Sequence, residues 1–436
     1  MKKLAIILVL IFNSLVLFAQ GNIISFDNYR FRVNNNLFFP IGWYGGSHTD
    51  LKRMKKNGAN VVLQYWANVI KDYWKDYLVH HSERWGEKDC NLYRKYLKEY
   101  LDAANLAGIK VIVELPTENV PLDNDEKNHH LMSNSFISKV VGDDSIRFHP
   151  ALLGWYQADE PEGLRKTVKI TQAFLVSRYK LIKSLDSDHP VFVVFADPKA
   201  LTKSFPISRG RIFDVAMLDI YPMRSNEKTP YQNYWWTRDF YRIFKNEFYS
   251  STSPDSGSTI IVEQGYGYNN PINSDFRDPE LSEIYYHAFT PIYWAQDSSY
   301  NNLGGLMFWD YDDANSNCRE IIDSFMQCFS QNDFGKIILQ DNLYKYVGTT
   351  DFSYWPIRTF KRFYNKSYYL FTFNDNTVSL TNYSIIIKGI GDNIHCINLS
   401  KSGINIESHI SSLGTGNQLL IDSWQPLEVR IYKITP

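Results

Sequence analysis

Eight short apolar runs alternate with helical patterns along most of this 436-residue chain. The runs cover residues 39–43, 60–65, 110–115, 151–157, 191–195, 215–220, 259–263 and 305–309. Most of them are apolar throughout, as expected for parallel strands that are covered on both faces. Strands that alternate with helices are typical of βαβ units and a parallel sheet. The pattern therefore predicts an α/β fold.

The length of this region decides between two parallel-sheet architectures. The stretch from the first run to the last is close to the ~250 residues that a (β/α)8 barrel needs. An open doubly wound sheet would instead carry a G-x-G-x-x-G phosphate loop after an early strand. The glycines at Gly42, Gly45 and Gly46 do not have that spacing. The sequence thus predicts a (β/α)8 TIM barrel over residues 20–338.

The segments on either side of the eight runs have a different pattern of apolar and turn-forming residues. Residues 22–39 look like a short β-hairpin, with Asn34, Asn35 and Asn36 in its turn. Beyond residue 339, short β-branched segments are separated by Asn, Gly and Ser, and apolar and polar residues alternate near the end of the chain. We expect a small antiparallel, β-sandwich-like C-terminal domain over residues 339–436.

The first residues are typical of an export signal. Lys2 and Lys3 precede an apolar run that ends near Phe18, and the small residue Ala19 follows. We expect a signal peptide over residues 1–19 and a secreted or periplasmic protein, without stable membrane insertion after its removal. An uncleaved N-terminal anchor is the alternative. The four cysteines are scattered, which predicts neither a disulfide framework nor a zinc site, although one bridge remains open.

Charge and composition narrow the classes of partner. The net charge is −1, which argues against general attraction to nucleic acid. The chain has neither a G-x-x-x-x-G-K-[ST] phosphate loop nor a G-x-S-x-G elbow, and nothing in it demands a metal or a cofactor. Aromatic residues are abundant, with 11 Trp, 30 Tyr and 27 Phe, and flat aromatic faces suit sugar rings. An oligo- or polysaccharide is therefore the expected substrate.

Two glutamates lie where predicted strands end. Glu160 follows the fourth run in G-W-Y-Q-A-D-E-P-E, and Glu263 ends the seventh in I-I-V-E-Q-G-Y. Strand ends form the active-site face of such a barrel. Cleavage of a glycosidic bond needs a proton for the leaving oxygen and a group that stabilises positive charge at the anomeric carbon. Two carboxyls can divide these tasks, one protonated and one ionised.

In these motifs the sequence resembles the clan A glycoside hydrolases, a superfamily of retaining (β/α)8 enzymes. The resemblance covers about residues 22–330, and implies that Glu160 is the catalytic acid/base and Glu263 the nucleophile. It also implies that Tyr221, after the sixth strand, hydrogen-bonds the nucleophile. Trp309, in G-L-M-F-W-D-Y, would floor the subsite for the bound sugar.

One residue departs from that superfamily. Many members have Asn directly before the acid/base Glu, whereas this chain has Asp159. An ionised Asp accepts hydrogen bonds but cannot donate one, so recognition of the sugar 2-hydroxyl is open. A non-catalytic carbohydrate-binding protein on the same scaffold is one alternative. Inverting hydrolysis, or assistance by an N-acetyl group of the substrate, is another, because an adjacent Asp–Glu pair is compatible with such assistance.

Other polar and aromatic residues follow the predicted strands and could contact sugar hydroxyls. The expected substrate-binding residues are Trp43, Gln64, Glu114, Asp159, Tyr221 and Trp309, with His48, Trp66, Glu118, Asp310, Asp312 and Asp313 as weaker candidates.

Overall fold

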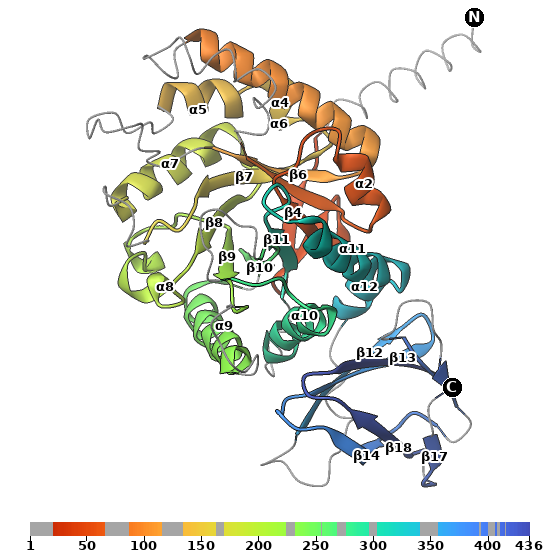
Figure 1. Cartoon of the computed structure of the whole chain (residues 1–436). Helices are drawn as coiled ribbons and strands as arrows, with labels where there is room; N and C mark the ends of the chain where they lie inside the picture. The colour runs from red at the N-terminus through yellow and green to blue at the C-terminus, as the bar shows by residue number, and fades with distance from the viewer. Residues whose placement is uncertain are drawn as a thin grey trace, which may run out of the picture.

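A closed parallel barrel forms the larger part of the molecule (Figure 1). The computed structural model describes residues 21–65, 87–115, 134–162, 170–223, 232–253, 255–267, 276–295, 303–340, 356–391, 394–399, 406–407, 410–414 and 416–436. Within these residues, eight strands close the barrel in the order β10-β11-β4-β5-β6-β7-β8-β9. They are β4 (Ile41–Tyr44), β5 (Val61–Gln64), β6 (Lys110–Glu114), β7 (Leu152–Ala158), β8 (Val191–Phe195), β9 (Val215–Ile220), β10 (Ser258–Gln264) and β11 (Gly305–Trp309). The predicted TIM barrel is confirmed.

Helices surround the barrel and cover the outer face of its strands (Figure 1). They are α2 (Leu51–Lys56), α4 (Glu87–Ala107), α5 (Asn134–Val141), α6 (Asp144–Arg147), α7 (Gln172–Leu185), α8 (Ala200–Lys203), the 3₁₀ turn η1 (Ile207–Arg209), α9 (Gln232–Ser251), α10 (Leu281–Ala295), α11 (Ser316–Gln331) and α12 (Phe334–Ile338). Gly58 and Gly108 follow α2 and α4 with positive φ, as glycines that end helices do. Pro291 lies inside α10, which is continuous, so the proline does not divide this helix.

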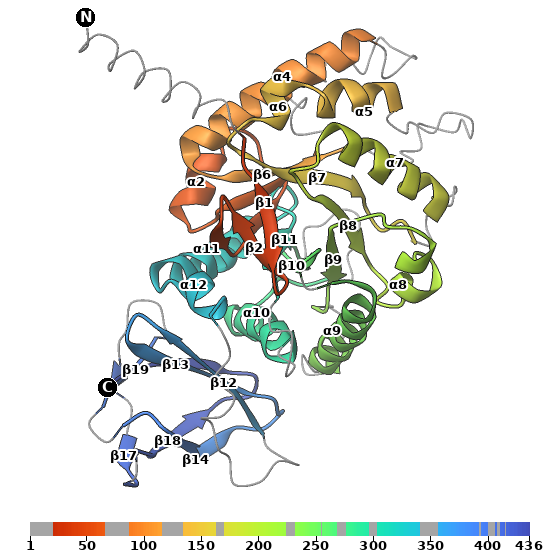
Figure 2. The ribbon, with the colours of Figure 1, turned by 180° about the vertical axis from the view of Figure 1, so that it is seen from behind.

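A small N-terminal sheet packs against the end of the barrel at which the strands begin (Figure 2). It has three strands, β1 (Ile24–Asp27), β2 (Arg30–Val33) and β3 (Asn36–Phe38), rather than the predicted hairpin. The missed turn is at Asn28 and Tyr29, which both have positive φ. The ring of Phe31 on β2 stacks on Phe192 of β8, with the centroids 6.1 Å apart. The N-terminal sheet therefore covers one end of the barrel and leaves the other end, where the strands finish, uncovered by this sheet.

Two antiparallel sheets form the C-terminal part of the chain. One has the order β12-β13-β19-β15-β16 and the other β14-β18-β17. Their strands are β12 (Ile357–Tyr364), β13 (Ser367–Asn374), β14 (Leu380–Ile387), β15 (His395–Asn398), β16 (Ile406–Glu407), β17 (Ile410–Ser412), β18 (Gln418–Trp424) and β19 (Val429–Thr435). The expected C-terminal β-domain is therefore present, while its exact boundary at residue 339 stays a prediction.

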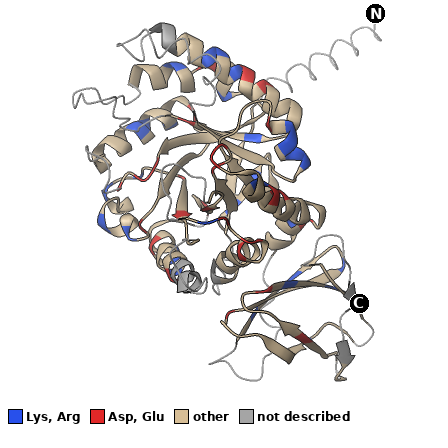
Figure 3. Cartoon of the chain, viewed as in Figure 1, with Lys and Arg blue, Asp and Glu red and all other residues tan. Residues whose placement is uncertain are grey.

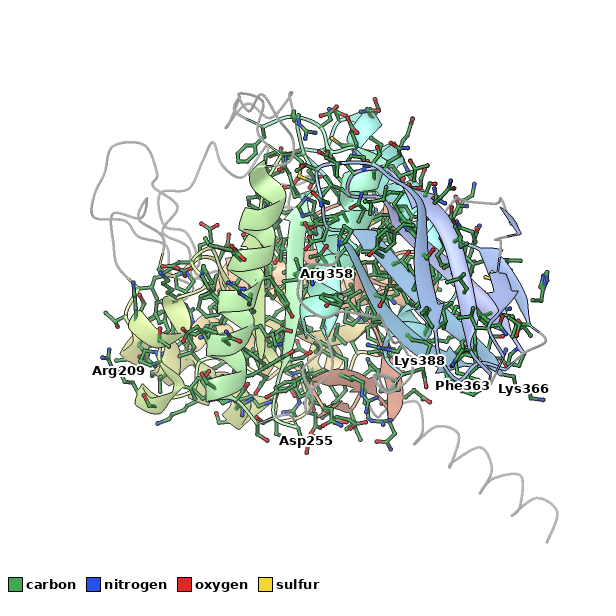
Figure 4. All side chains as sticks on the ribbon, turned by 90° about the horizontal axis from the view of Figure 1, so that it is seen from below. Arg209, Asp255, Arg358, Phe363, Lys366 and Lys388 are labelled. Atoms are coloured by element: carbon green, nitrogen blue, oxygen red, sulfur yellow. The ribbon has the colours of Figure 1, made fainter. Side chains whose placement is uncertain are left out.

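The C-terminal sheets are fastened to the barrel through α10. The Tyr286 hydroxyl on α10 donates to Asp375 at 2.7 Å, and Arg358 on β12 bonds the other oxygen of the same carboxylate. Figure 4 shows Arg358 on the side of these sheets that faces the barrel. Phe371 of β13 also packs on Phe289 of α10, with centroids 5.4 Å apart. The two parts thus share one apolar core.

A buried carboxylate holds β7, the strand that leads to Glu160. Asp186, at the end of α7, accepts hydrogen bonds from the Trp155 indole and from His189, both at 2.8 Å. Burial works against the charge of Asp186, but the hydrogen bonds from His189 and Trp155 outweigh it and lower the pKa of Asp186. Its contribution to stability is thus present at neutral pH and is lost as the pH falls through that lowered pKa.

Asp186→Ala is expected to lower the free energy of unfolding by about 3 kcal/mol, because it leaves buried partners without an acceptor. Urea denaturation at neutral pH measures this loss. Ser187→Ala is a matched control in the same turn, because the Ser187 side chain is exposed. Equal midpoints for the two variants would show that Asp186 does not hold β7.

Three remaining sequence predictions concern export and the cysteines. Residues 1–19, the predicted signal peptide, lie outside the described residues. In the described part of the chain, no helix combines the length and apolarity that a membrane span requires. Cys90, Cys318, Cys328 and Cys396 are all buried free thiols, so the bridge that the sequence left open is not formed.

Candidate active site

Strand register tells which side chains of the barrel face inward. Residues paired across parallel strands point to the same face, and successive residues alternate. Val262 of β10 pairs with Asp219 of β9 and with Met307 of β11. Val262 and Met307 belong to the apolar cluster inside the barrel. Asp219 therefore also faces the barrel interior, at the end where the strands finish.

Asp159 and Glu160 follow directly after β7, at the same end of the barrel. Both side chains are half-buried. Asp159 accepts a hydrogen bond from the hydroxyl of Tyr156, an inward residue of β7, at 2.9 Å. Glu160 has φ of 38°, in the left-handed region that costs a non-glycine residue about 1–2 kcal/mol. Such strained residues are concentrated at functional sites.

Asp219 is the partner of Glu160 at this opening. Asp219 lies close enough to Glu160 and to the Tyr221 hydroxyl for both groups to affect its pKa. Burial, followed by the charges of Glu160 and Asp159, raises the pKa of Asp219 well above its usual range. Two neighbouring carboxyls that are partly removed from water cannot both ionise at little cost, so the pair holds a proton at neutral pH. Figure 3 shows acidic positions gathered around the centre of the barrel.

Aromatic side chains surround these acids. Trp309 at the end of β11 is half-buried, and its indole N–H donates to the Tyr65 hydroxyl at 2.8 Å. The Tyr221 ring lies 5.6 Å from that of Trp309, centroid to centroid, at 33°. Burial, then the charge of Asp159, raises the pKa of both Tyr65 and Tyr156, so both phenols stay protonated. The structure thus brings the predicted Tyr221 and Trp309 to the opening.

Glu114, predicted as a substrate-binding residue, also faces the interior. It pairs in register with Tyr156. Its side chain is nearly buried, and its charge contributes to the raised pKa of Tyr65. Glu114 therefore belongs to the same group of residues as Asp159.

Glu263 does not belong to this group, although the sequence predicted it at the opening as the nucleophile. It pairs in register with Ile220 and Phe308, which lie in the apolar layer between the strands and the helices. Its side chain is 1 % exposed, and neither carboxyl oxygen has a hydrogen-bond partner. Burial raises the pKa of Glu263 to about 8. The Glu263 carboxyl therefore stays protonated at neutral pH on the outer side of the barrel strands, and the Tyr221 hydroxyl lies near Asp219 instead.

Gln264 occupies the inward position that the sequence assigned to Glu263. It pairs with Trp309 in register. Its side-chain oxygen accepts the Met223 N–H at 2.9 Å, and its amide N–H group donates to the carbonyls of Tyr266 at 2.9 Å and Arg277 at 3.0 Å. Gln264 therefore fixes the loops that follow β9 and β10.

Trp43 and Gln64 were also predicted at the opening, and both placements are wrong. Trp43 is fully buried on the outer face of β4, where it pairs with Phe308 and packs edge-on against Tyr311. Gln64 is fully buried on the outer face of β5, and its amide donates to the backbone of Tyr65. Neither side chain can reach a ligand in the opening. The weaker candidates Trp66 and Glu118 lie outside the described residues.

Glu162 is a further acid next to the site that sequence reasoning missed. Its Oε1 accepts the backbone N–H groups of Ala196 at 2.6 Å and Asp197 at 2.9 Å. Burial raises the pKa of Glu162 to about 7, and the nearby charge of Glu160 adds to this effect. Glu162 thus joins the loop of Glu160 to the loop after β8. The sequence signal that could have identified Glu162 was its position two residues after Glu160, directly after Pro161.

Comparisons with known proteins identify solved structures that share this fold. No protein-family model matches the chain, and no curated protein sequence matches it. Among solved structures, one titled "Glycoside hydrolase" is 12 % identical, with 95 % of this chain and 97 % of that chain covered and a TM-score of 0.59. A GH30 endoxylanase from Clostridium papyrosolvens is 11 % identical, with 91 % and 96 % covered and a TM-score of 0.51. An Anoxybacillus alpha-amylase is 11 % identical, with 90 % and 91 % covered and a TM-score of 0.50. At this identity the likeness shows the shared fold.

Proposed function

We propose that this protein is a glycoside hydrolase that cleaves a glycosidic bond in an extracellular oligo- or polysaccharide, with Glu160 as the proton donor. One observation carries the proposal: the Glu160 and Asp219 carboxyls are near neighbours at the strand ends of the barrel, where Asp219 faces the interior. That end is where barrels of this type place their active sites. The export signal predicted over residues 1–19 is part of the same proposal.

The carboxyl pair has the properties that proton donation requires. A general acid must be protonated at the working pH and then release its proton to the leaving oxygen. The raised pKa of Asp219 keeps a proton within the pair. Once Glu160 has released that proton, it can accept one from an attacking water. Glu160 therefore acts as acid and base in turn, while Asp219 positions it.

The aromatic side chains fit a sugar as the ligand. The Trp309 and Tyr221 rings lie next to each other near the acids, and both side chains are half-buried. The faces of such rings pack against the C–H faces of a pyranose, and their indole and phenol groups remain polar. Glu114 and Asp159 add carboxylates that accept hydrogen bonds from hydroxyl groups.

A panel of para-nitrophenyl glycosides tests the proposal directly. The purified protein is expected to release nitrophenol from at least one member, and Glu160→Gln, prepared in the same way, should release it more slowly. Release of nitrophenol by both preparations at equal rates would contradict a role for Glu160. Turnover of none of the panel or of natural polysaccharides would contradict the proposed activity.

A non-catalytic carbohydrate-binding protein is the second candidate. It is favoured by one observation: β10 presents the amide Gln264 to the opening in place of a carboxylate. This candidate predicts sugar binding by calorimetry without hydrolysis, and equal affinity for the intact protein and Glu160→Gln. The glycosidase proposal predicts hydrolysis of the ligand that binds.

A further inference from the structure

We infer that Glu162 is a positioning residue, which holds the proton donor Glu160 in place by tying its loop to the end of β8. This inference rests on the proposed function and adds a residue to the same site. Three observations carry it: the backbone strain at Glu160, the hydrogen bonds on both sides of that residue, and the rigidity of the end of β8.

The backbone that carries Glu160 is not in an ordinary conformation. Glu160 has φ of 38°, which a non-glycine residue keeps only where the surrounding structure imposes it. The register between β7 and β8 also shifts between Tyr156 and Ala158, just before the loop begins. Such irregularities change the direction of the side chains next to them. Contacts beyond the strand ladder therefore have to fix the direction in which Glu160 points.

Glu162 supplies such a contact on the C-terminal side of Glu160. Its Oε1 accepts the backbone N–H groups of Ala196 at 2.6 Å and Asp197 at 2.9 Å. Hydrogen bonds to an ionised carboxylate are about twice as strong as neutral ones. Pro161, which separates the two glutamates, is buried, and its ring fixes its φ. Few free torsions therefore lie between the proton donor and this anchor.

The N-terminal side of Glu160 is held as well. Asp159 accepts a hydrogen bond from the Tyr156 hydroxyl at 2.9 Å, and the Tyr156 side chain is buried inside the barrel. Glu160 thus lies between two anchored residues. Release of the Glu162 anchor would let the backbone of Glu160 relax out of the left-handed region, which is unfavourable for a residue with a Cβ atom.

The end of β8 is a rigid anchor. Phe195, its last residue, is fully buried and packs edge-on against Phe213, with the ring centroids 5.7 Å apart. The residues that follow form a closed turn. Asp197 Oδ1 accepts the Lys199 N–H at 2.9 Å, and the Asp197 carbonyl accepts the Ala200 N–H at 2.9 Å, where α8 begins. The loop of Glu160 is therefore fastened to the barrel wall itself.

The Glu162 carboxyl is not placed to contact a substrate. Its Oε1 is used by two backbone groups, and its other oxygen, Oε2, is buried. Neither oxygen is thus in position to bind a sugar hydroxyl or to protonate a leaving group. Its effect on the reaction has to pass through Glu160.

Glu162→Met tests this inference on two substrates that differ in their leaving group. They are a para-nitrophenyl glycoside that the intact protein hydrolyses and an unactivated oligosaccharide of the same sugar. Methionine keeps the bulk of the side chain but is only a weak hydrogen-bond acceptor. On the oligosaccharide, kcat is expected to fall by about a hundredfold with little change in KM, because a small misplacement of a catalytic group costs rate. The loss on the nitrophenyl glycoside should be smaller, because nitrophenol leaves without assistance.

The ratio of the two rates does not depend on the fraction of folded protein, so it reports positioning even in a less stable variant. Glu162→Gln should keep kcat within about fivefold of the intact protein, because its amide oxygen can still accept both N–H groups. Lys199→Ala, which changes an exposed side chain in the anchoring turn, is the matched control and should leave both rates unchanged. Equal losses in Glu162→Met and Glu162→Gln, or equal losses on both substrates, would overturn the inference.

A double variant tests whether Glu162 acts through Glu160. In Glu160→Gln no proton donor remains to be positioned, so the addition of Glu162→Met should lower the rate on the oligosaccharide little further. A further loss as large as the one that Glu162→Met causes alone would show that Glu162 acts independently, and would overturn the inference.

The proposed function and the inference fail through different outcomes. Loss of activity in Glu160→Gln together with full activity in Glu162→Met would overturn the inference and leave the proposed function standing. Hydrolysis of no substrate by the intact protein would overturn both. A selective loss on the oligosaccharide in Glu162→Met, restored in Glu162→Gln and absent in the Glu160→Gln background, supports both.

Discussion

Glu160→Gln is expected to lower kcat/KM for an unactivated glycan by about 10³-fold, within the range that general acid catalysis supplies. The amide keeps the size of the carboxyl but cannot transfer a proton to the leaving oxygen. Because nitrophenol leaves without assistance, the loss should be smaller on nitrophenyl glycosides than on the natural bond. Steady-state rates on both kinds of substrate measure this difference.

The thermal unfolding midpoint of Glu160→Gln is the control, and it should match that of the intact protein. A loss of equal size on both kinds of substrate would contradict proton donation, because the effect of an acid depends on the leaving group. An unchanged rate on the natural bond would exclude Glu160 from the reaction.

Asp219→Asn is expected to lower kcat by about a hundredfold at neutral pH and to narrow the pH range of activity. In the intact protein, burial and then the charges of Glu160 and Asp159 raise the pKa of Asp219, so the pair keeps a proton to higher pH than an isolated carboxyl would. An Asn carries no charge that favours this proton. The basic limb of the kcat/KM profile should therefore move to lower pH.

The direction of this shift separates a partner in proton transfer from a residue that only supports the fold. A structural defect would lower the rate at every pH and leave the shape of the profile unchanged. A basic limb that moves to higher pH, or does not move, would contradict the shared proton. Asp219 acts through Glu160 in this account, so binding of the product should change little.

The fold could be predicted from sequence because its signals are local. Buried parallel strands are apolar on both faces, and the glycines Gly58 and Gly108 mark where helices end. The fourth and seventh strands were therefore found within one or two residues of their observed limits. The turn at Asn28 and Tyr29 was missed because a tyrosine with positive φ gives no recognisable turn signal.

The sequence could not predict which residues of each buried strand face the barrel interior. The uniform apolarity that made the strands easy to find also hides this alternation. Ile260, Ile261 and Val262 are all apolar, so the sequence shows no alternation that would indicate which side Glu263 takes. The register with β9 and β11 settles the question and places Gln264 inward. Asp219 was detectable in principle, because an acid inside an apolar run requires a polar neighbour.

The same lack of alternation explains why Trp43 and Gln64 were predicted at the opening. Both lie at the ends of strands, and both have side chains that bind sugars in many proteins. Their burial among apolar residues of the outer layer became visible only from strand pairing. Asp159, Glu160 and Tyr221 were placed correctly because they lie beyond or at the last residue of a strand, where the chain turns into the opening.

The most direct test of the account is the activity of Glu263→Gln, measured beside the intact protein on one substrate that the intact protein hydrolyses. Glu263 lies behind the barrel wall, and its carboxyl is neutral at the pH of the assay, so an amide should replace it without loss. The account predicts kcat/KM close to that of the intact protein and an unchanged pH profile. A loss as large as that of Glu160→Gln, in a variant that folds normally, would contradict it.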